Sequence, residues 1–291
     1  MKRSTNKTSK FTLLVAAVCV MTFFSCDEQN SIEVQSDAVL DEISDDVELE
    51  TSFEEVDDLA IAGAEHDFST GGKSERDGRF ECAELTKEET EGGVIITIDF
   101  GDGCTGPNGI VKTGIIQITK SGNHWIPGST LVIELIDFTI NEVALEGIRT
   151  VTNISESIDV APVFSIILEG GKATWPSGTT ATREVDRTRT LIRDNNPLGD
   201  EVHVEGITRG VNREGNNVEV LILERLVFKR SCRGGNKFIP VSGVKQITVG
   251  ERVYTIDFGD GTCDNIATKT VNGVATEFTI NPRRFKNHLG G

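Results

Sequence analysis

From about residue 79 onward, short runs of apolar and β-branched residues alternate with turns rich in Gly, Asn and Asp. Such runs, with a turn signal roughly every ten residues and no helical period, are typical of β-strands. The clearest runs span residues 94–98, 114–119, 130–136, 163–168 and 218–223. The pattern predicts that residues 79–285 form an all-β domain of antiparallel strands.

Internal repeats refine this prediction. The segment Ile98-Asp-Phe-Gly-Asp-Gly103 recurs as Ile256-Asp-Phe-Gly-Asp-Gly261, with a cysteine before and after each copy. Residues 113–119 are similar to 242–248, and 145–150 are more weakly similar to 204–209. Each of these four strands contains a glycine: Gly114, Gly147, Gly206 and Gly243. Because a glycine inside a strand marks a bulge, a bend or a close backbone approach, we expect a curved antiparallel sheet, sandwich or barrel-like, built from internal repeats.

Residues 26–75 have a different character. Sixteen of the 46 acids lie between residues 27 and 67, a stretch without Lys or Arg. Apolar residues recur there at the three- and four-residue spacing of an amphipathic helix that could dock on the domain. They are Val39, Ile43, Val47, Leu49, Phe53 and Val56. Because like charges four residues apart oppose an isolated helix, we predict a flexible acidic tether, with a short helix as the alternative.

The first 25 residues have the pattern of a secretory signal peptide. Four basic residues precede an apolar run from Phe11 to Phe24, which is too short to span a bilayer. Ser25-Cys26 follows, and a cysteine after a small residue at this place resembles the lipobox of bacterial lipoproteins. The resemblance implies cleavage before Cys26 and acylation of its sulfur, for instance with palmitate. The alternative is an ordinary cleaved signal with Cys26 as a bystander.

Charge bears on partners and location. The formal net charge is −17, but beyond residue 67 the chain holds 30 acids and 25 bases. Without a basic excess, nucleic-acid binding is not predicted. Asp27 and Glu28 resemble the acidic surface-export signal of Bacteroidetes lipoproteins, which implies a lipid-anchored, surface-exposed protein of the outer membrane. The alternative is an ordinary acidic linker.

Four cysteines remain after the signal and Cys26: Cys82, Cys104, Cys232 and Cys263. An even number in an exported protein indicates two disulfides. The repeat predicts the pairs Cys82–Cys104 and Cys232–Cys263, although two other connectivities are open. Zinc is disfavoured because no CxxC pair is present.

Acids cluster in the two repeated segments and offer oxygen ligands for calcium. The candidates are Asp99, Asp102, Asp257, Asp260 and Asp264. Gly-Asp-Gly is also a good hairpin turn, and this is the interpretation we favour. No cofactor is predicted.

Two further features are candidates for ligand binding. Arg187 and Arg189 alternate with threonines and would share one face of a strand. There they could bind an external ligand, such as a carboxylate or a sulfated sugar. The alternative is that they pair with acids of neighbouring strands. Trp125 and Trp175 lie beside prolines in predicted turns, where they either stack on a sugar ring or cover the end of the core.

No arrangement of the four histidines indicates a Ser–His–Asp triad, and GxSxG and HExxH are absent from the sequence. The repeated segments, with residues 187–190 and 210–215, resemble a group of uncharacterised Bacteroidetes lipoproteins, which brings no catalytic residues. We therefore expect a non-catalytic binding or interaction module whose partner is an outer-membrane protein or an external glycan or protein. The alternatives are a structural subunit of an envelope or fimbrial assembly and a carboxylate-dependent hydrolase.

Overall fold

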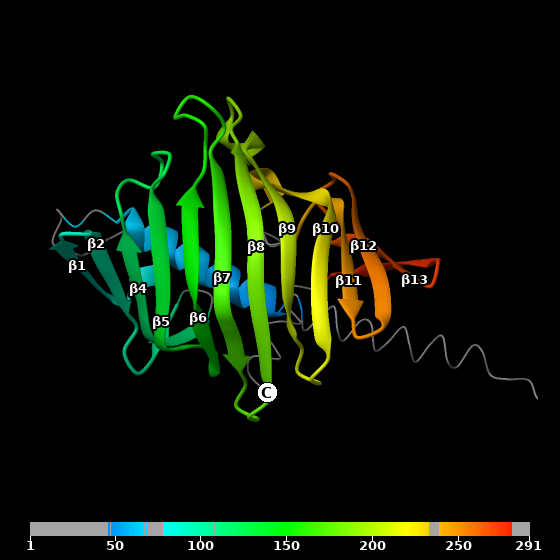
Figure 1. Ribbon diagram of the computed structural model, residues 1–291, viewed down its shortest axis with the longest axis horizontal. Coiled ribbons are helices and arrows are strands. Elements are labelled where there is room, and N and C mark those ends of the chain that lie inside the picture. Colours follow the sequence, from blue (N-terminus) through cyan, green and yellow to red (C-terminus); the bar gives the residue numbers. More distant parts are fainter. Residues whose placement is uncertain are drawn as a thin grey trace, which may run out of the picture. The chain divides into compact units, whose positions relative to one another are not determined.

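The computed structural model in Figure 1 describes residues 46, 48–66, 68, 78–106, 109–232 and 239–280. The predicted signal peptide, the lipidation of Cys26 and residues 26–45 of the predicted tether lie outside the described residues. Within the described part of the chain, no helix is both long and apolar enough to cross a membrane.

The described residues form one sheet of fourteen strands. The strands are β1 (Glu84–Thr90), β2 (Gly93–Asp99), β3 (Cys104–Thr105), β4 (Val111–Lys120), β5 (Thr130–Ile140), β6 (Val143–Asn153), β7 (Val163–Thr174), β8 (Thr180–Ile192), β9 (Glu201–Val211), β10 (Asn217–Lys229), β11 (Ser242–Val249), β12 (Arg252–Asp260), β13 (Ile266–Val271) and β14 (Val274–Thr279). Short 3-10 turns, η2 (Gly78–Phe80), η3 (Pro197–Gly199) and η4 (Arg230–Cys232), join some of them.

The sheet follows the order of the chain, apart from the short strand β3, which pairs with β4 beside the main path. Every neighbouring pair is antiparallel. The sheet is curved and does not close on itself, so β1 and β14 are its two edges (Figure 1). The predicted all-β, antiparallel, curved architecture is confirmed.

The repeated glycines lie where strands bulge. Gly114 interrupts the register between β4 and β5, and Gly243 interrupts that between β11 and β12. Both have positive φ, 76° and 108°. A Cβ at Gly114 would lie 2.2 Å from the carbonyl oxygen of Asp137, closer than any side chain tolerates. The glycines therefore allow bends that an L-residue would obstruct.

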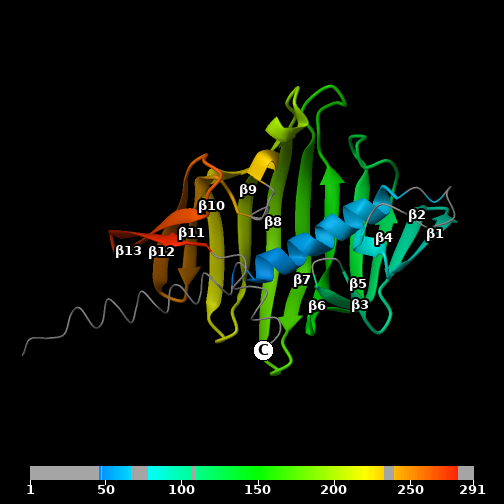
Figure 2. The ribbon, with the colours of Figure 1, turned by 180° about the vertical axis from the view of Figure 1, so that it is seen from behind.

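The helix predicted as an alternative within the tether is present at residues 48–64. It crosses β4 to β8 on one face of the sheet (Figure 2). Leu49, Phe53, Val56, Leu59 and Ala60 are buried against that face, at the three- and four-residue spacing of the prediction. This part of the predicted tether thus belongs to the folded domain.

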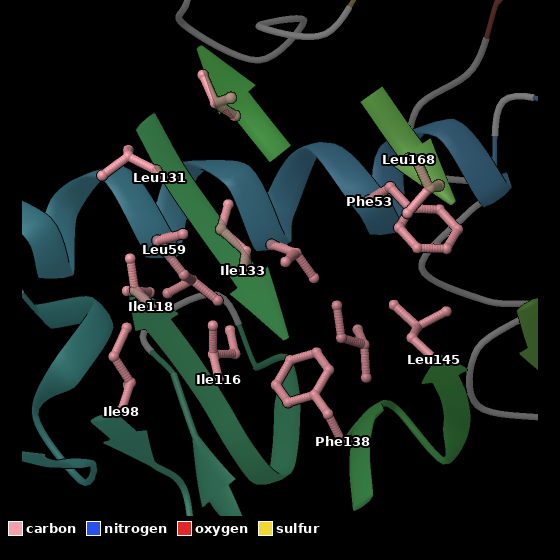
Figure 3. Close-up of a cluster of buried hydrophobic side chains, with 14 of the residues drawn as sticks. Phe53, Leu59, Ile98, Ile116, Ile118, Leu131, Ile133, Phe138, Leu145 and Leu168 are labelled. Carbon is pink, nitrogen blue, oxygen red and sulfur yellow. The ribbon is translucent and has the colours of Figure 1, made fainter. Parts of the chain in front are cut away.

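The hydrophobic core lies mainly between the helix and the first half of the sheet. Figure 3 shows Phe53 and Leu59 of the helix in one cluster with apolar side chains of β2, β4, β5, β6 and β7. Gly63 permits the closest approach, because a Cβ there would lie 2.8 Å from Cδ1 of Ile98. The second half of the sheet, from β9 onward, is not crossed by the helix (Figure 2).

Both disulfides form as the repeat predicts, Cys82 with Cys104 and Cys232 with Cys263. The first joins the segment before β1 to β3. The second joins η4 to the segment after β12. Each copy of the repeated Asp-Phe-Gly-Asp-Gly segment is therefore followed by a cysteine that closes a covalent loop, 22 and 31 residues apart in sequence.

Candidate functional site

The acidic side chains of the helix are paired with basic side chains from the sheet. Glu50 contacts the guanidinium groups of Arg183 and Arg187 on β8. One turn later, Glu54 accepts hydrogen bonds of 2.6 and 2.9 Å from Nη2 of Arg189. The three arginines share one face of β8 because alternate residues of a strand point the same way. The predicted row of arginines on one face of a strand is therefore present. Its carboxylate partners come from the helix.

Similar pairs hold the start and the middle of the helix. Asp46 lies 2.8 Å from Nζ of Lys245 on β11, which ties the start of the helix to the second half of the sheet. Further along, the pairs are Glu55–Lys112 at 3.1 Å and Asp57–Arg149 at 2.6 Å. The acids would destabilise this helix in isolation because they repel one another. In the folded domain they stabilise it, because basic side chains of the sheet pair with them.

Burial and pairing shift the pKa values of these acids in different directions. Burial tends to raise the pKa of Glu50, but the attraction of Arg187 and Arg183 outweighs it and holds the value well below its usual range. Burial raises the pKa of Asp57 to about 6, because Arg149 offsets only part of the desolvation. Between the helix and the sheet, the carboxylate of Glu50 is therefore held ionised, whereas that of Asp57 titrates at about pH 6.

A cleft of about 520 Å³ lies beside the helix and is lined by residues of β8, β9, β10, β11 and β12. Glu50 and Glu54 line it from the helix, next to their partners Arg187 and Arg189. Because ion pairs fix this wall to the sheet, the cleft is a preformed feature of the fold.

Apolar side chains form much of the remaining lining, and we call six of them the apolar floor. They come from β8, β9 and β10: Leu191, Val202, Val204, Ile222, Leu226 and Phe228. Phe258, from the second copy of the repeated segment, also lines the cleft, whereas its counterpart Phe100 is buried in the core under the helix. The phenylalanines of the two copies therefore have different surroundings, one in the cleft and the other in the core.

One end of the cleft carries a group of cations that we call the cationic rim: Arg193, Lys229 and Arg230. Arg193 and Arg230 share one carboxylate, Asp200, at 3.2 and 3.4 Å. Lys229 donates to the carbonyl oxygen of Gly261 at 2.8 Å. The rim has more positive charge than Asp200 alone can balance.

The tryptophans lie at the two ends of the helix and outside the lining of the cleft. Trp175 is buried and donates from Nε1 to Glu48 at 3.1 Å, while the guanidinium of Arg213 lies 4.5 Å from its ring centre. Trp125 is partly exposed and donates from Nε1 to Glu65 at 3.2 Å. Both contacts fit the interpretation that these rings cover the ends of the core.

The calcium candidates lie in or just after two strands: Asp99 ends β2, Asp257 and Asp260 belong to β12, and Asp102 and Asp264 follow these strands. Oδ1 of Asp99 accepts from the amide of Gly101, and Oδ1 of Asp257 accepts from that of Gly259, both at 2.8 Å. Asp260 and Asp264 accept from amides two residues ahead in the same way, and Asp102 is exposed. Within the described ranges, no group of three or more His, Cys, Asp or Glu side chains gathers as a metal site would require. The predicted turn is present in the first copy, at Gly101 and Asp102, whereas Gly259 and Asp260 of the second copy belong to strand β12.

Sequence reasoning missed the cleft, although a signal for one wall was present. The acids at positions 46, 50, 54 and 57 share a helical face, and the basic residues at 183, 187 and 189 share a strand face. Their complementary spacing favours docking of the helix on β8. No local pattern indicates that β8, β9, β10, β11 and β12 leave a cleft beside it.

Comparisons of the chain with protein-family models, with curated proteins and with solved structures found no match. The resemblance to Bacteroidetes lipoproteins therefore stays a prediction.

Proposed function

We propose that this protein is a lipid-anchored, non-catalytic binding module of the bacterial outer membrane, exposed at the cell surface, and that its ligand occupies the cleft. The observation that supports this most is the cleft itself. Its volume of about 520 Å³ lies within the range of small-molecule sites, which are concave, mostly apolar and supplied with a few placed polar groups.

The walls of the cleft suit binding better than transformation of a ligand. The helix acids Glu50 and Glu54 are engaged by arginines, and Asp57, the carboxyl with a raised pKa, does not line the cleft. The hydrolase alternative would need two acids free to face a substrate. The paired arrangement supports a rigid receptor.

Membrane attachment rests on the sequence around Cys26. Replacing Cys26 by Ala should move the protein from the membrane fraction to the soluble fraction. Protease added to intact cells should digest the wild-type protein if it is displayed at the surface. Retention of the Cys26→Ala protein in washed membranes would contradict the lipid anchor, and full protection from protease would contradict display.

The role of the cleft is tested by crosslinking on intact cells, purification and mass spectrometry with two matched variants. Ile222→Trp fills the cleft, whereas Leu223→Trp adds the same bulk at the next, solvent-exposed position outside the lining. We expect a ligand or partner with the wild type and Leu223→Trp, and its loss with Ile222→Trp. Equal recovery from all three proteins would show that the cleft is not the site.

A second function, as a subunit of an envelope or fimbrial assembly, is supported by an asymmetry between the two edge strands. β1 carries Glu84, Lys87, Glu88 and Glu89, charges of the kind that block pairing with another strand. β14 has one charged residue, Glu277, and is exposed along most of its length. Its free edge suits strand addition by a partner. Under this alternative, Thr276→Lys should abolish copurification of a partner, whereas Thr86→Lys on β1 should not.

A further inference from the structure

We propose that the ligand of the cleft is an acyl chain with an anionic head group, its chain on the apolar floor and its head group at the cationic rim. This inference rests on the proposed binding function and names its ligand class. It is argued from how charge is distributed within the cleft.

The apolar floor defines the body of the ligand. Val204 and Val202 of β9 pair with Leu226 and Phe228 of β10, and Ile222 of β10 also lines the cleft. None of these side chains offers a hydrogen bond. A sugar laid on this surface would lose its hydrogen bonds with water and gain none in return. A hydrocarbon chain loses nothing there and removes apolar surface from water.

The wall formed by the helix does not compete for the head group. Arg187 and Arg189 line the cleft, but Glu50 and Glu54 already neutralise them. Lys245 is likewise paired with Asp46. An anion at this wall would meet carboxylates as closely as cations, so it would gain little.

The cationic rim is different. Arg193 and Arg230 are about half exposed, at 55% and 45%, and share the carboxylate of Asp200. Arg193 also lies 5.5 Å from the ring centre of Trp125. Asp200 is itself held in place, because its Oδ1 accepts from the amide of Asp194 at 3.0 Å. Lys229 adds a third cation with a carbonyl partner.

Other acids lie near the rim: Glu201 contacts the ring of His203 at 2.8 Å, and Asp260 is close enough to Lys229 for their charges to interact. An anion placed between Arg193 and Arg230 would therefore meet two guanidinium groups that share a single carboxylate. Carboxylate and phosphate groups both suit guanidinium donors. An amphiphile whose charged end meets the rim would place its chain over the floor.

The test uses the full exported chain with Cys26→Ala, so that its own acyl groups cannot enter the cleft. One arm measures binding of sodium oleate, below its micelle concentration, by titration calorimetry. The other measures co-sedimentation with phosphatidylcholine vesicles that contain phosphatidylglycerol. Binding in either arm supports the proposal and identifies the source of the chain as a free fatty acid or a membrane lipid.

Variants separate the head group from the chain. Arg193→Ala with Arg230→Ala should weaken oleate binding roughly tenfold or more, as expected for loss of charge-assisted hydrogen bonds, and leave binding of oleyl alcohol unchanged. Ile222→Trp should abolish binding of both, and Leu223→Trp should not. Arg209→Ala, at an exposed pair outside the cleft, controls for general loss of charge. Circular dichroism confirms that each variant is folded, and Arg193→Lys with Arg230→Lys should restore part of the affinity.

The proposal is overturned if the wild type binds neither oleate nor vesicles, or if the arginine variant binds oleate as the wild type does. If crosslinking still captures a ligand that Ile222→Trp loses, the binding function stands and only the ligand class is wrong. If crosslinking captures nothing and the wild type binds neither oleate nor vesicles, the proposed function itself fails.

Discussion

Asp57 of the helix and Arg149 of β6 meet through a hydrogen bond of 2.6 Å from Nη2 to Oδ2 and a close contact of 2.5 Å between Nε and Oδ1. Their side chains are only 1% and 6% exposed. Because both charges have left water, each depends on the other. The pair fixes the register of the helix on the sheet, and so the position of the wall that the helix contributes to the cleft.

Removing one partner of this pair should destabilise the protein strongly. Arg149→Met leaves the Asp57 carboxyl buried without its main counter-ion, and we expect a loss of about 3–5 kcal/mol in the free energy of unfolding. Denaturation in urea measures it. Arg209→Ala, which removes an exposed pair with Glu219, is the control and should cost less than about 1 kcal/mol. Equal losses would mean that the buried pair does not hold the helix.

Stability should depend on pH through Asp57. Its pKa is about 6 in the folded protein and 3.8 ordinarily, so within this window the folded state holds a proton that the unfolded chain has released. Lowering the pH from 6 to 4 therefore stabilises the wild type through this group. Asp57→Asn lacks this contribution. The stability of the wild type relative to Asp57→Asn should rise as the pH falls, and parallel curves would contradict the raised pKa.

Glu50 should also make stability depend on pH, but in the opposite direction to Asp57 and at lower pH. Its pKa in the folded protein lies below the ordinary 4.5, so its contribution is present above that value and is lost as the pH falls further. The stability advantage of the wild type over Glu50→Gln should therefore shrink between about pH 5 and pH 2.5. Urea denaturation across this range measures it, and an advantage that grows instead would contradict the pairing with Arg183 and Arg187.

The sequence predicts the beginnings of the strands better than their ends. The apolar run at 163–168 begins β7, but the strand continues to Thr174 through Gly170 and Gly171, which in sequence look like a turn. Gly170 has φ 62° and the register with β8 shifts there, so the glycines bend the strand without ending it. Local patterns cannot distinguish a bulge from a turn because both use glycine.

The sequence pattern indicates the helix but not the cleft. Leu49, Phe53 and Val56 have the correct spacing, but the surrounding acids argue against a helix until the arginines of β8 are brought next to them. That pairing joins residues more than a hundred positions apart. The cleft is formed by residues of five strands and the helix. These residues are far apart in the sequence, so no local pattern indicates that they line one cleft.

The bulge glycines should tolerate no side chain. A Cβ at Gly243 would lie 2.3 Å from the carbonyl oxygen of Arg225, whereas at Gly178, also with positive φ, nothing lies within 4 Å. Gly178→Ala should cost about 1–2 kcal/mol, the ordinary penalty of a left-handed L-residue. Gly243→Ala should cost clearly more, or prevent folding, because backbone must move. Thermal denaturation of both variants measures the difference, and equal melting temperatures would contradict the close approach.

The two disulfides should be similar in their contribution to stability and different in their effect on binding. Loops of 22 and 31 residues each correspond to about 3 kcal/mol in the chain-entropy model, so Cys82→Ala with Cys104→Ala and Cys232→Ala with Cys263→Ala should lower stability comparably. Only the second bridge adjoins the cationic rim, because Arg230 and Cys232 belong to the same 3-10 turn. Its removal frees that turn and should weaken oleate binding, whereas removal of the first should leave the affinity unchanged at temperatures where both variants are folded. A loss of affinity with the Cys82 and Cys104 variant alone would mean that the rim is not where the head group binds.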